Sequence, residues 1–158
     1  MKTNFVLGID PGKSGGWVIL DRESTVKHYG KMPLIGGEIW IEEIACKIQQ
    51  YPKDELLVVL EKVHSMPKQG VKGVFSFGEG YGKLKGMCQA LGIRYEMVTP
   101  QSWKKVVLQS TKQDKDAAIE FVQRRLPEIN LTAYPCRKPH DGIADAACIA
   151  VWGIRTQI

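Results

Sequence analysis

Hydrophobic residues near the start of the chain form short runs that turn residues separate. Three such runs occupy residues 4–9, 16–20 and 26–30, and their length and boundaries predict strands that pair antiparallel. A fourth run, residues 56–60, is apolar throughout, which is typical of a strand covered on both faces in a parallel sheet. A fifth strand is expected over residues 93–98.

Helical spacing of apolar residues predicts four helices. They are expected over residues 38–48, from the end of a Gly- and Lys-rich loop at 62–80 to about Ala90, over 114–126 with Asp114 as N-cap, and over 141–154. Three antiparallel strands followed by strands that alternate with helices predict an α/β fold, a mixed five-stranded sheet flanked by helices. The 158 residues show no repeat or linker, so one domain over residues 1–158 is expected.

Composition adds information mainly about partners. The chain has 22 Lys and Arg against 17 Asp and Glu, a formal charge of +5, which favours an anionic partner such as nucleic acid. No run approaches the roughly 18 apolar residues of a membrane span, and no secretion signal is recognisable. We therefore expect an intracellular, cytoplasmic protein without a membrane partner.

The four cysteines are scattered along the chain and form no C-x-x-C pair; they are Cys46, Cys88, Cys136 and Cys148. A thiolate zinc site is therefore not expected. Reduced thiols in the core are the expectation for a chain with no secretion signal.

The first apolar run ends in a carboxylate, Asp10, followed by Pro11 and Gly12. Asp-Pro-Gly is good turn chemistry by itself, because Pro fixes φ and Gly accepts positive φ. Gly12-Lys13-Ser14 resembles the end of a P-loop, but the spacing is wrong, and a strand is predicted where a P-loop opens a helix. The pattern favours a hairpin that presents Asp10 at its end, and no nucleotide cofactor is expected.

Glu61 ends the fourth apolar run as Asp10 ends the first. Ligands of open α/β sheets bind beyond the carboxyl ends of the parallel strands, so these carboxylates would meet if their strands are neighbours. Asp141 and Asp145 lie four residues apart and share one helix face, where like charges destabilise a helix by about 0.2–0.5 kcal/mol. Asp141 can cap the helix. Asp145 lies among alanines, where a partly buried carboxylate is unfavourable unless a cation or hydrogen bonds compensate its charge; a structural salt bridge to a Lys is the simplest explanation.

Four clustered carboxylates suit hard cations that prefer oxygen ligands, such as Mg²⁺. Two such ions about 3.5–4 Å apart can stabilise the attacking and leaving oxygens of a phosphoryl displacement. The expected substrate is then a phosphodiester, which agrees with the basic composition.

Taken together, these motifs resemble the RuvC-like Holliday junction resolvases, particularly their compact phage and organelle branch. The resemblance runs in order over essentially the whole chain, through Gly8–Gly12, Glu61 after its apolar strand, Val98-Thr99-Pro100 followed by Trp103-Lys104, and Asp141–Asp145. It implies a ribonuclease H-like fold and a homodimer with two active sites. It also implies paired nicking of four-way DNA junctions that depends on Mg²⁺ or Mn²⁺, with two ions per site, and it suits a phage-encoded protein that acts in a host cytoplasm.

The resemblance implies an acidic tetrad, Asp10, Glu61, Asp141 and Asp145, with Lys104 near it. The best-known bacterial pattern spaces its last two acids by three, and counting back three from Asp145 reaches Gly142. The fourth ligand is therefore Asp141, which helical geometry favours, or His140, whose imidazole can hold such metals. Lys104 could stabilise charge that develops on the phosphate, or it could form a solvated helix face with Lys105.

Basic and aromatic residues outside the tetrad are candidates for DNA contact; they are Lys68, Lys72, Phe75, Phe77, Lys105, Lys112, Lys115 and His140. Lys112 and Lys115 flank the expected start of the third helix, where cations oppose the helix dipole and a phosphate would explain them. Phe75 and Phe77 would lie on different faces of a helix, so at least one is expected to be free to stack on an unpaired base. Burial in the core is the competing interpretation.

Three rival functions remain open from the sequence. A nuclease of ribonuclease H-like fold that acts on RNA or on RNA–DNA hybrids would use the same metals. A junction or nucleic-acid binder without catalytic activity would use the carboxylates only for structure. A sugar-kinase-like ATP-binding domain also begins with strand-Asp-x-Gly, but 158 residues leave no room for its second lobe.

Overall fold

The computed structural model describes residues 2–64, 68–109, 116–133, 135 and 137–158. Its centre is a five-stranded sheet with the strand order β3-β2-β1-β6-β7. The strands are β1 Phe5–Asp10, β2 Gly16–Asp21, β3 Val26–Lys31, β6 Leu56–Glu61 and β7 Tyr95–Val98. The pairs β1–β2 and β2–β3 are antiparallel, and the pairs β1–β6 and β6–β7 are parallel. The mixed sheet predicted from the sequence is confirmed, with strand ends shifted by one or two residues.

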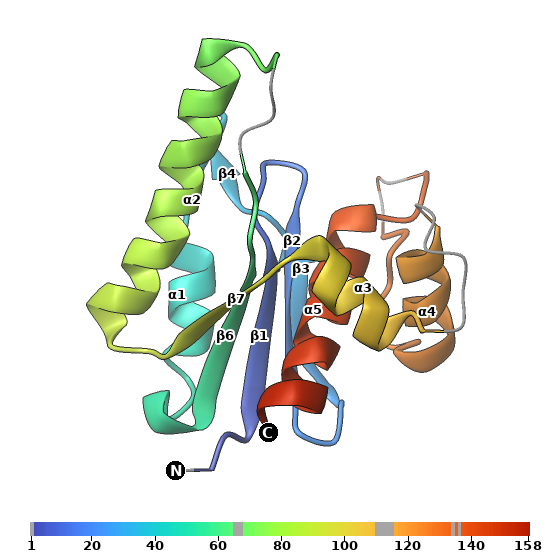
Figure 1. The fold of residues 1–158 in the computed structure, drawn as a ribbon. Helices are drawn as coiled ribbons and strands as arrows, with labels where there is room; N and C mark the ends of the chain where they lie inside the picture. The colour runs from blue at the N-terminus through green and yellow to red at the C-terminus, as the bar shows by residue number, and fades with distance from the viewer. Residues whose placement is uncertain (1, 65–67, 110–115, 134, 136) are drawn as a thin grey trace.

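Helices cover both faces of this sheet (Figure 1). One face carries α1 and α2, and the other carries α3, α4 and α5, of which α5 packs against β1 and β2. Their bounds are α1 Glu42–Ile48, α2 Val71–Leu91, α3 Pro100–Val107, α4 Ala117–Arg125 and α5 Asp141–Gln157, and a 3₁₀ turn spans Lys53–Glu55. Among the described residues, no helix has the length and apolar content to cross a membrane.

The central strands contribute side chains to two hydrophobic cores, one on each face of the sheet. Val6 of β1 and Val59 of β6 are buried on the side of α5, whereas Leu7 and Val58 are buried on the side of α2. Successive side chains of a strand point to opposite faces, so a strand covered on both sides must be apolar at every position. This explains the continuous apolar run of β6.

Glycine allows α5 to lie directly on the sheet. A Cβ atom on Gly8 of β1 would stand 2.2 Å from the carbonyl oxygen of Ala146 and 2.5 Å from the backbone nitrogen of Ala150. Similarly, a Cβ atom on Gly16 would stand 2.9 Å from the backbone of Ile143. The position of α5, and therefore of the acidic residues at its start, depends on these backbone contacts.

The predicted helix over residues 38–48 is wrong at its start. Glu38–Ile39 forms strand β5, which pairs antiparallel with β4, Leu34–Ile35. The two residues between these strands, Gly36 and Gly37, have φ angles of 58° and 78°. Two successive positive φ angles are typical of the tight turn in a two-residue hairpin, and Gly adopts them without strain.

The predicted loop at residues 62–80 is wrong beyond Gly70, because α2 begins at Val71 and continues through several glycines. Burial of Leu84 and Met87 against the sheet stabilises this helix. Tertiary packing of this kind outweighs the low helix propensity of Gly. The helix ends at Gly92, whose φ of 64° is the left-handed conformation common after helices.

Three further differences concern helices of the second half. Helix α3 is absent from the predicted set, although Thr99 accepts a hydrogen bond from the backbone N–H of Ser102 and Pro100 is its first residue. These are helix-start signals. Helix α4 begins after Asp116, and the expected cap, Asp114, lies outside the described residues. Helix α5 extends three residues beyond the predicted end at 154.

The cysteines follow the expectation only in part. Cys88 and Cys148 are buried free thiols, as predicted. Cys46 is also a free thiol but is exposed on α1, so the expectation of a core position is wrong for it. Cys136 lies outside the described residues.

Candidate active site

Asp10 and Glu61 end two neighbouring parallel strands. Ile9 of β1 pairs with Leu60 of β6, so the residues that follow them lie at the same edge of the sheet. Both carboxylates line one open cavity of about 310 Å³, together with Asp141 at the start of α5. The sequence analysis set the adjacency of these strands as a condition, and the structure meets it, so three acidic residues that are distant in sequence line one cavity.

The start of α5 is pressed against the turn between β1 and β2. Gly15 and Gly142 form a parallel bridge, and a Cβ atom on Gly142 would stand 2.4 Å from the carbonyl oxygen of Ser14. The position three residues before Asp145 therefore has no room for a side chain in this structure. Of the positions considered for a fourth acidic residue, 141 provides a carboxylate at the cavity.

Burial and mutual repulsion disturb the ionisation of these carboxylates. Burial, with repulsion from Glu61, Asp145 and Asp141, raises the pKa of Asp10 to about 8. Burial and the charge of Glu61 raise the pKa of Asp145 to about 7, against the opposing effect of Lys104. Burial also raises the pKa of Glu61. The negative charges share one electrostatic environment that lacks sufficient compensating positive charge.

This donor set fits a hard divalent cation. Within the described parts of the chain, no group of three or more His, Cys, Asp or Glu side chains has an arrangement that could hold a metal ion. Carboxylate oxygens are nevertheless the ligands that Mg²⁺ and Mn²⁺ prefer, and Mg²⁺ commonly keeps several waters and takes only one or two protein carboxylates. A divalent cation in the cavity would also supply the positive charge that the raised pKa values of Asp10 and Asp145 show to be lacking.

Trp103 is a site residue to which the sequence analysis assigns no role. Its indole Nε1 donates a 2.7 Å hydrogen bond to Oε1 of Glu61, and this bond opposes the rise in the pKa of that carboxyl. Trp103 is completely buried in the core beside α5. The start signals of α3 could have revealed a helix that carries Trp103 and Lys104 toward the end of β6.

Lys104, the predicted cation of the site, lies close to the acidic residues. Its ammonium group is 5.4 Å from the centre of the Trp103 ring, and its charge opposes the rise in the pKa of both Glu61 and Asp145. Lys13 also lines the carboxylate cavity and was not among the predicted site residues. Its position directly after the Asp-Pro-Gly turn was the available signal.

His140 takes the helix-capping role that the sequence analysis allowed for Asp141. Its Nδ1 accepts a 3.1 Å hydrogen bond from the backbone N–H of Ile143. Asp141 instead accepts a 2.9 Å bond from the N–H of Gly142. Burial and the charge of Lys31 lower the pKa of His140. With Nδ1 occupied by the cap, Nε2 is the ring nitrogen that remains for another ligand.

The two candidate aromatics differ as their spacing predicts. Phe75 is 72% exposed, whereas Phe77 lines the carboxylate cavity and stacks on Tyr81 with ring centres 5.9 Å apart. Lys68 and Lys72 are exposed near the start of α2. Lys105 lines a different cavity, beside Trp152. Lys112 and Lys115 lie outside the described residues, and DNA contact by any of these side chains stays a prediction.

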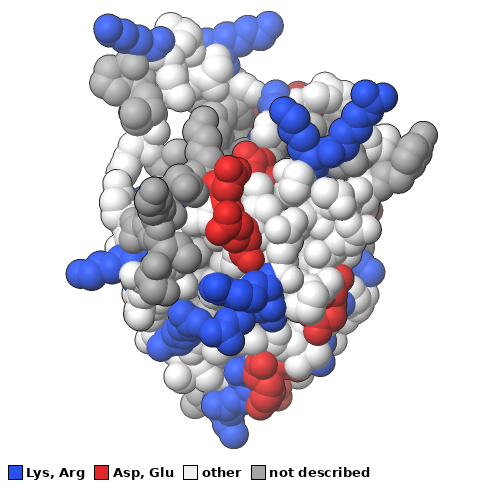
Figure 2. Space-filling view, turned by 90° about the vertical axis from the view of Figure 1, so that its right-hand side faces the viewer, with Lys and Arg blue, Asp and Glu red and all other residues white. Residues whose placement is uncertain are grey.

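The Lys and Arg side chains that the structure describes do not form one continuous patch on the side of α3, α4 and α5 (Figure 2). Figure 2 shows that Lys and Arg side chains stand there in separate groups, with Asp and Glu side chains between them. Charge alone therefore does not mark this face as a DNA surface.

This protein is similar to known proteins in structure, but no significant similarity in sequence was found. No protein-family profile matches the sequence, and no curated protein sequence matches it significantly. Thermus thermophilus RuvC in complex with a Holliday junction substrate matches with a TM-score of 0.70 and 16% identity, over 94% of this chain and 92% of RuvC. A second T. thermophilus RuvC structure matches with a TM-score of 0.65 and 18% identity, over 97% and 96% of the two chains.

The yeast mitochondrial Holliday junction resolvase Ydc2 matches with a TM-score of 0.61 and 14% identity, over 98% of this chain and 79% of Ydc2. These similarities extend along nearly the whole chain, which agrees with the order of the sequence motifs. At such low identities they establish the architecture. The chain has the fold of RuvC and Ydc2, which is the ribonuclease H-like fold that the sequence resemblance implied.

Proposed function

We propose that this protein is a divalent-metal-dependent endonuclease that resolves four-way DNA junctions, acting as a homodimer that makes paired nicks. The observation that carries the proposal is the cavity at the ends of β1 and β6, where Asp10, Glu61 and Asp141 meet. The fold shared with RuvC, which was solved with a Holliday junction substrate, supports the choice of substrate.

In this proposal Asp10, Glu61, Asp141 and Asp145 hold Mg²⁺ or Mn²⁺, two ions per site. The bound metal would supply an activated water and stabilise charge on the leaving oxygen. Trp103 orients the Glu61 carboxylate through its indole N–H. Lys104, whose charge reaches Glu61 and Asp145, would offset the negative charge that builds up on the phosphate.

The cavity edge suggests how an opened junction is contacted. Phe77 presents its ring at the wall of the carboxylate cavity, where an unpaired base could stack on it. Lys68 and Lys72 lie nearby in sequence and are exposed, so they could contact phosphates. His140 and Lys105 lie farther along the chain and are weaker candidates, because His140 caps α5 and Lys105 lines another cavity.

The exposed face of α2 supports the homodimer. Val71 and Phe75 are 88% and 72% exposed, and Gly78, Gly82 and Gly86 continue the same face at helical spacing. A Cβ atom on any of these three glycines would have no atom of the described residues within 4 Å. A mid-helix Gly costs about 1 kcal/mol relative to Ala, so contacts inside this subunit do not explain them. Close packing of α2 against α2 of a second copy would.

The catalytic proposal is tested by cleavage of synthetic substrates. A four-way junction, a duplex, a flap and an RNA–DNA hybrid are offered with and without Mg²⁺ or Mn²⁺. We expect metal-dependent paired nicks in the junction. Asp145→Asn should retain junction binding and lose cleavage, while Asp54→Asn, an exposed acid beside the opposite end of β6, should behave as wild type. Preferred cleavage of the hybrid would favour an RNA-directed nuclease. Binding without any cleavage would favour a non-catalytic binder.

The homodimer is tested by light scattering on Gly82→Gln. Within one subunit this change stabilises the helix, so a shift to monomer would report lost packing between copies. Gly73→Gln provides the control, because Gly73 lies on the opposite face of α2 and also has open space around it. A monomeric wild-type protein, or a dimer unaffected by Gly82→Gln, would contradict the proposed interface.

A further inference from the structure

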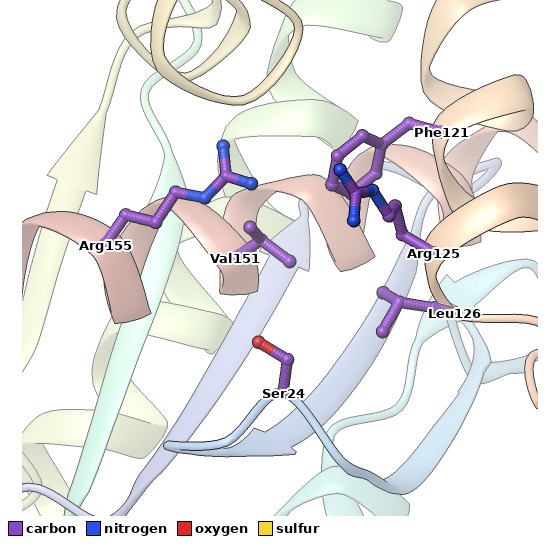
Figure 3. A pocket seen from close by; sticks show the side chains of 6 residues that line it. All are labelled: Ser24, Phe121, Arg125, Leu126, Val151 and Arg155. Carbon is purple, nitrogen blue, oxygen red and sulfur yellow. The ribbon is translucent and has the colours of Figure 1, made fainter.

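A second polar cavity lies away from the carboxylates, between the end of α4, the end of α5 and the turn that joins β2 to β3. It has a volume of about 230 Å³ and is lined by Ser24, Phe121, Arg125, Leu126, Val151 and Arg155 (Figure 3). None of these residues lines the carboxylate cavity. Ten residues of α5 separate Arg155 from Asp145, about 15 Å along the helix axis.

Arg155 is held in position by two neighbouring helices. Its Nη1 donates a 3.1 Å hydrogen bond to the carbonyl oxygen of Val106 at the end of α3. Its guanidinium lies 5.9 Å from the centre of the Phe121 ring of α4. Arg155 is itself exposed, and the N–H groups that these contacts leave over can donate to a ligand.

Arg125 directs a second positive charge toward the same space. In Figure 3 the Arg155 guanidinium lies above Val151, the Arg125 guanidinium lies at the Phe121 ring, and the Ser24 side chain points up from the strand turn below them. Among the residues that the structure describes, neither arginine forms a salt bridge. Asp21, an acid at the start of the turn, is bound to Lys27 at 2.9 Å. Two like charges that face one cavity without an anion repel each other.

The floor of the cavity is apolar, because it is formed by the side chains of Leu126, Val151 and Phe121. Each of these residues is at most 6% exposed. Its size is below the roughly 300 Å³ at which pockets for drug-sized ligands begin. Paired guanidiniums match the oxygens of a phosphate, and an apolar floor suits an adjoining sugar. A single phosphate group with its neighbouring atoms fits this combination better than a complete nucleotide.

We propose that this cavity binds a phosphate group, held by Arg125, Arg155 and the Ser24 hydroxyl. The source can be a nucleic-acid backbone or a free phosphate, and only the first source rests on the proposed function. Because the site is distant from the carboxylates, a backbone phosphate held here is not the one that is hydrolysed. It would anchor a flanking part of the substrate.

The test combines Arg125→Gln and Arg155→Gln in one protein; the Gln at 155 retains a donor for the Val106 carbonyl. Arg124→Gln is the matched control, because Arg124 is an exposed arginine in the same last turn of α4 and does not line the cavity. Circular dichroism checks folding. Arg125→Gln alone serves if the double variant is unstable, since Arg125 is exposed and has no salt bridge among the described residues.

Two measurements separate the sources of phosphate. In the first, fluorescence anisotropy follows binding of duplex DNA at several salt concentrations, with chelator and in an Asp145→Asn background, so that cleavage is irrelevant. A backbone site predicts that the slope of log K against log salt concentration becomes shallower by about 0.9 for each phosphate that the variant no longer neutralises.

In the second measurement, inorganic phosphate is added during thermal unfolding, with chloride at matched ionic strength as the control. A free-phosphate site predicts stabilisation by phosphate in the wild type and none in the double variant.

Either result, with Arg124→Gln unchanged, supports the phosphate site and names its source. If the double variant matches the Arg124→Gln control in both measurements, the proposal is overturned. A protein that binds duplex DNA through this cavity but cleaves no junction would contradict the catalytic proposal and leave this one intact.

Discussion

The indole Nε1 of Trp103 donates a 2.7 Å hydrogen bond to Oε1 of Glu61. The donor lies in the core under α3 and the acceptor ends β6, so the bond connects the packing of a helix to the candidate active site. Hydrogen bonds to charged groups contribute about 1.5–3 kcal/mol, and this one favours the ionised carboxylate that a metal ion requires.

Trp103→Phe should therefore weaken metal binding more than it weakens folding. We expect the Mg²⁺ concentration for half-maximal cleavage to rise about tenfold, because the loss of about 1.4 kcal/mol of carboxylate stabilisation is one factor of ten. A metal titration of the cleavage rate measures this. Trp40→Phe is the control, since Trp40 donates a similar 2.9 Å bond to Glu42 and neither of these residues lines the carboxylate cavity. If both variants need the same Mg²⁺ concentration for half-maximal cleavage, Trp103 has no role in metal binding.

Gly8→Ala should destabilise the protein by about 3 kcal/mol or more. The added methyl group would stand 2.2 Å from the Ala146 carbonyl oxygen, and backbone atoms of α5 cannot move aside as a side chain could. Urea unfolding measures the loss. Gly73→Ala is the control, because its surroundings are open and Ala favours the helix. An unchanged unfolding midpoint for Gly8→Ala would mean that α5 does not rest on β1.

Without metal, stability should fall as the pH rises. The pKa of Asp10 is raised from 3.8 to about 8, and that of Asp145 from 3.8 to about 7, so the folded state retains protons that the unfolded state releases. Between about pH 4 and the raised pKa values, each group lowers the unfolding free energy by up to about 1.4 kcal/mol per pH unit.

Thermal unfolding in chelator between pH 5 and pH 8.5 measures this effect. The melting temperature should decrease with pH in the wild type and change much less in an Asp10→Asn, Asp145→Asn double variant. Added Mg²⁺ should raise it more at pH 8 than at pH 6. A melting temperature that rises with pH over this range in chelator would contradict the raised pKa values of the two carboxyl groups.

The three described cysteines should differ in reactivity. Cys46 is exposed, whereas Cys88 and Cys148 are buried, and burial raises the pKa of Cys88 to about 11. Thiol reagents react with the ionised and accessible form. Iodoacetamide on the native protein, followed by peptide mass spectrometry, should modify Cys46 well before the other two. Comparable labelling of all three would indicate that α2 or α5 opens readily.

Several glycines show where prediction from the sequence fails. Local rules identify the strand ends at Asp10 and Glu61 because an apolar run that stops at a carboxylate is visible within a few residues. The same rules misplace the start of α2 and miss the hairpin at Gly36 and Gly37, since Gly is compatible with loop, turn or helix. Only packing against the sheet selects among these states.

The sequence by itself determined the alternation of strands and helices, the two-sided burial of β6 and the acidic residues at strand and helix ends. The period of the apolar residues and a carboxylate that directly follows an apolar run are short-range properties, and they need no coordinates. The tertiary structure decided that no side chain fits at Gly142, that Trp103 bonds to Glu61, and that Arg125 and Arg155 face one cavity. Each of these depends on distances between segments far apart in the chain, which the packing of α3, α4 and α5 on the sheet sets.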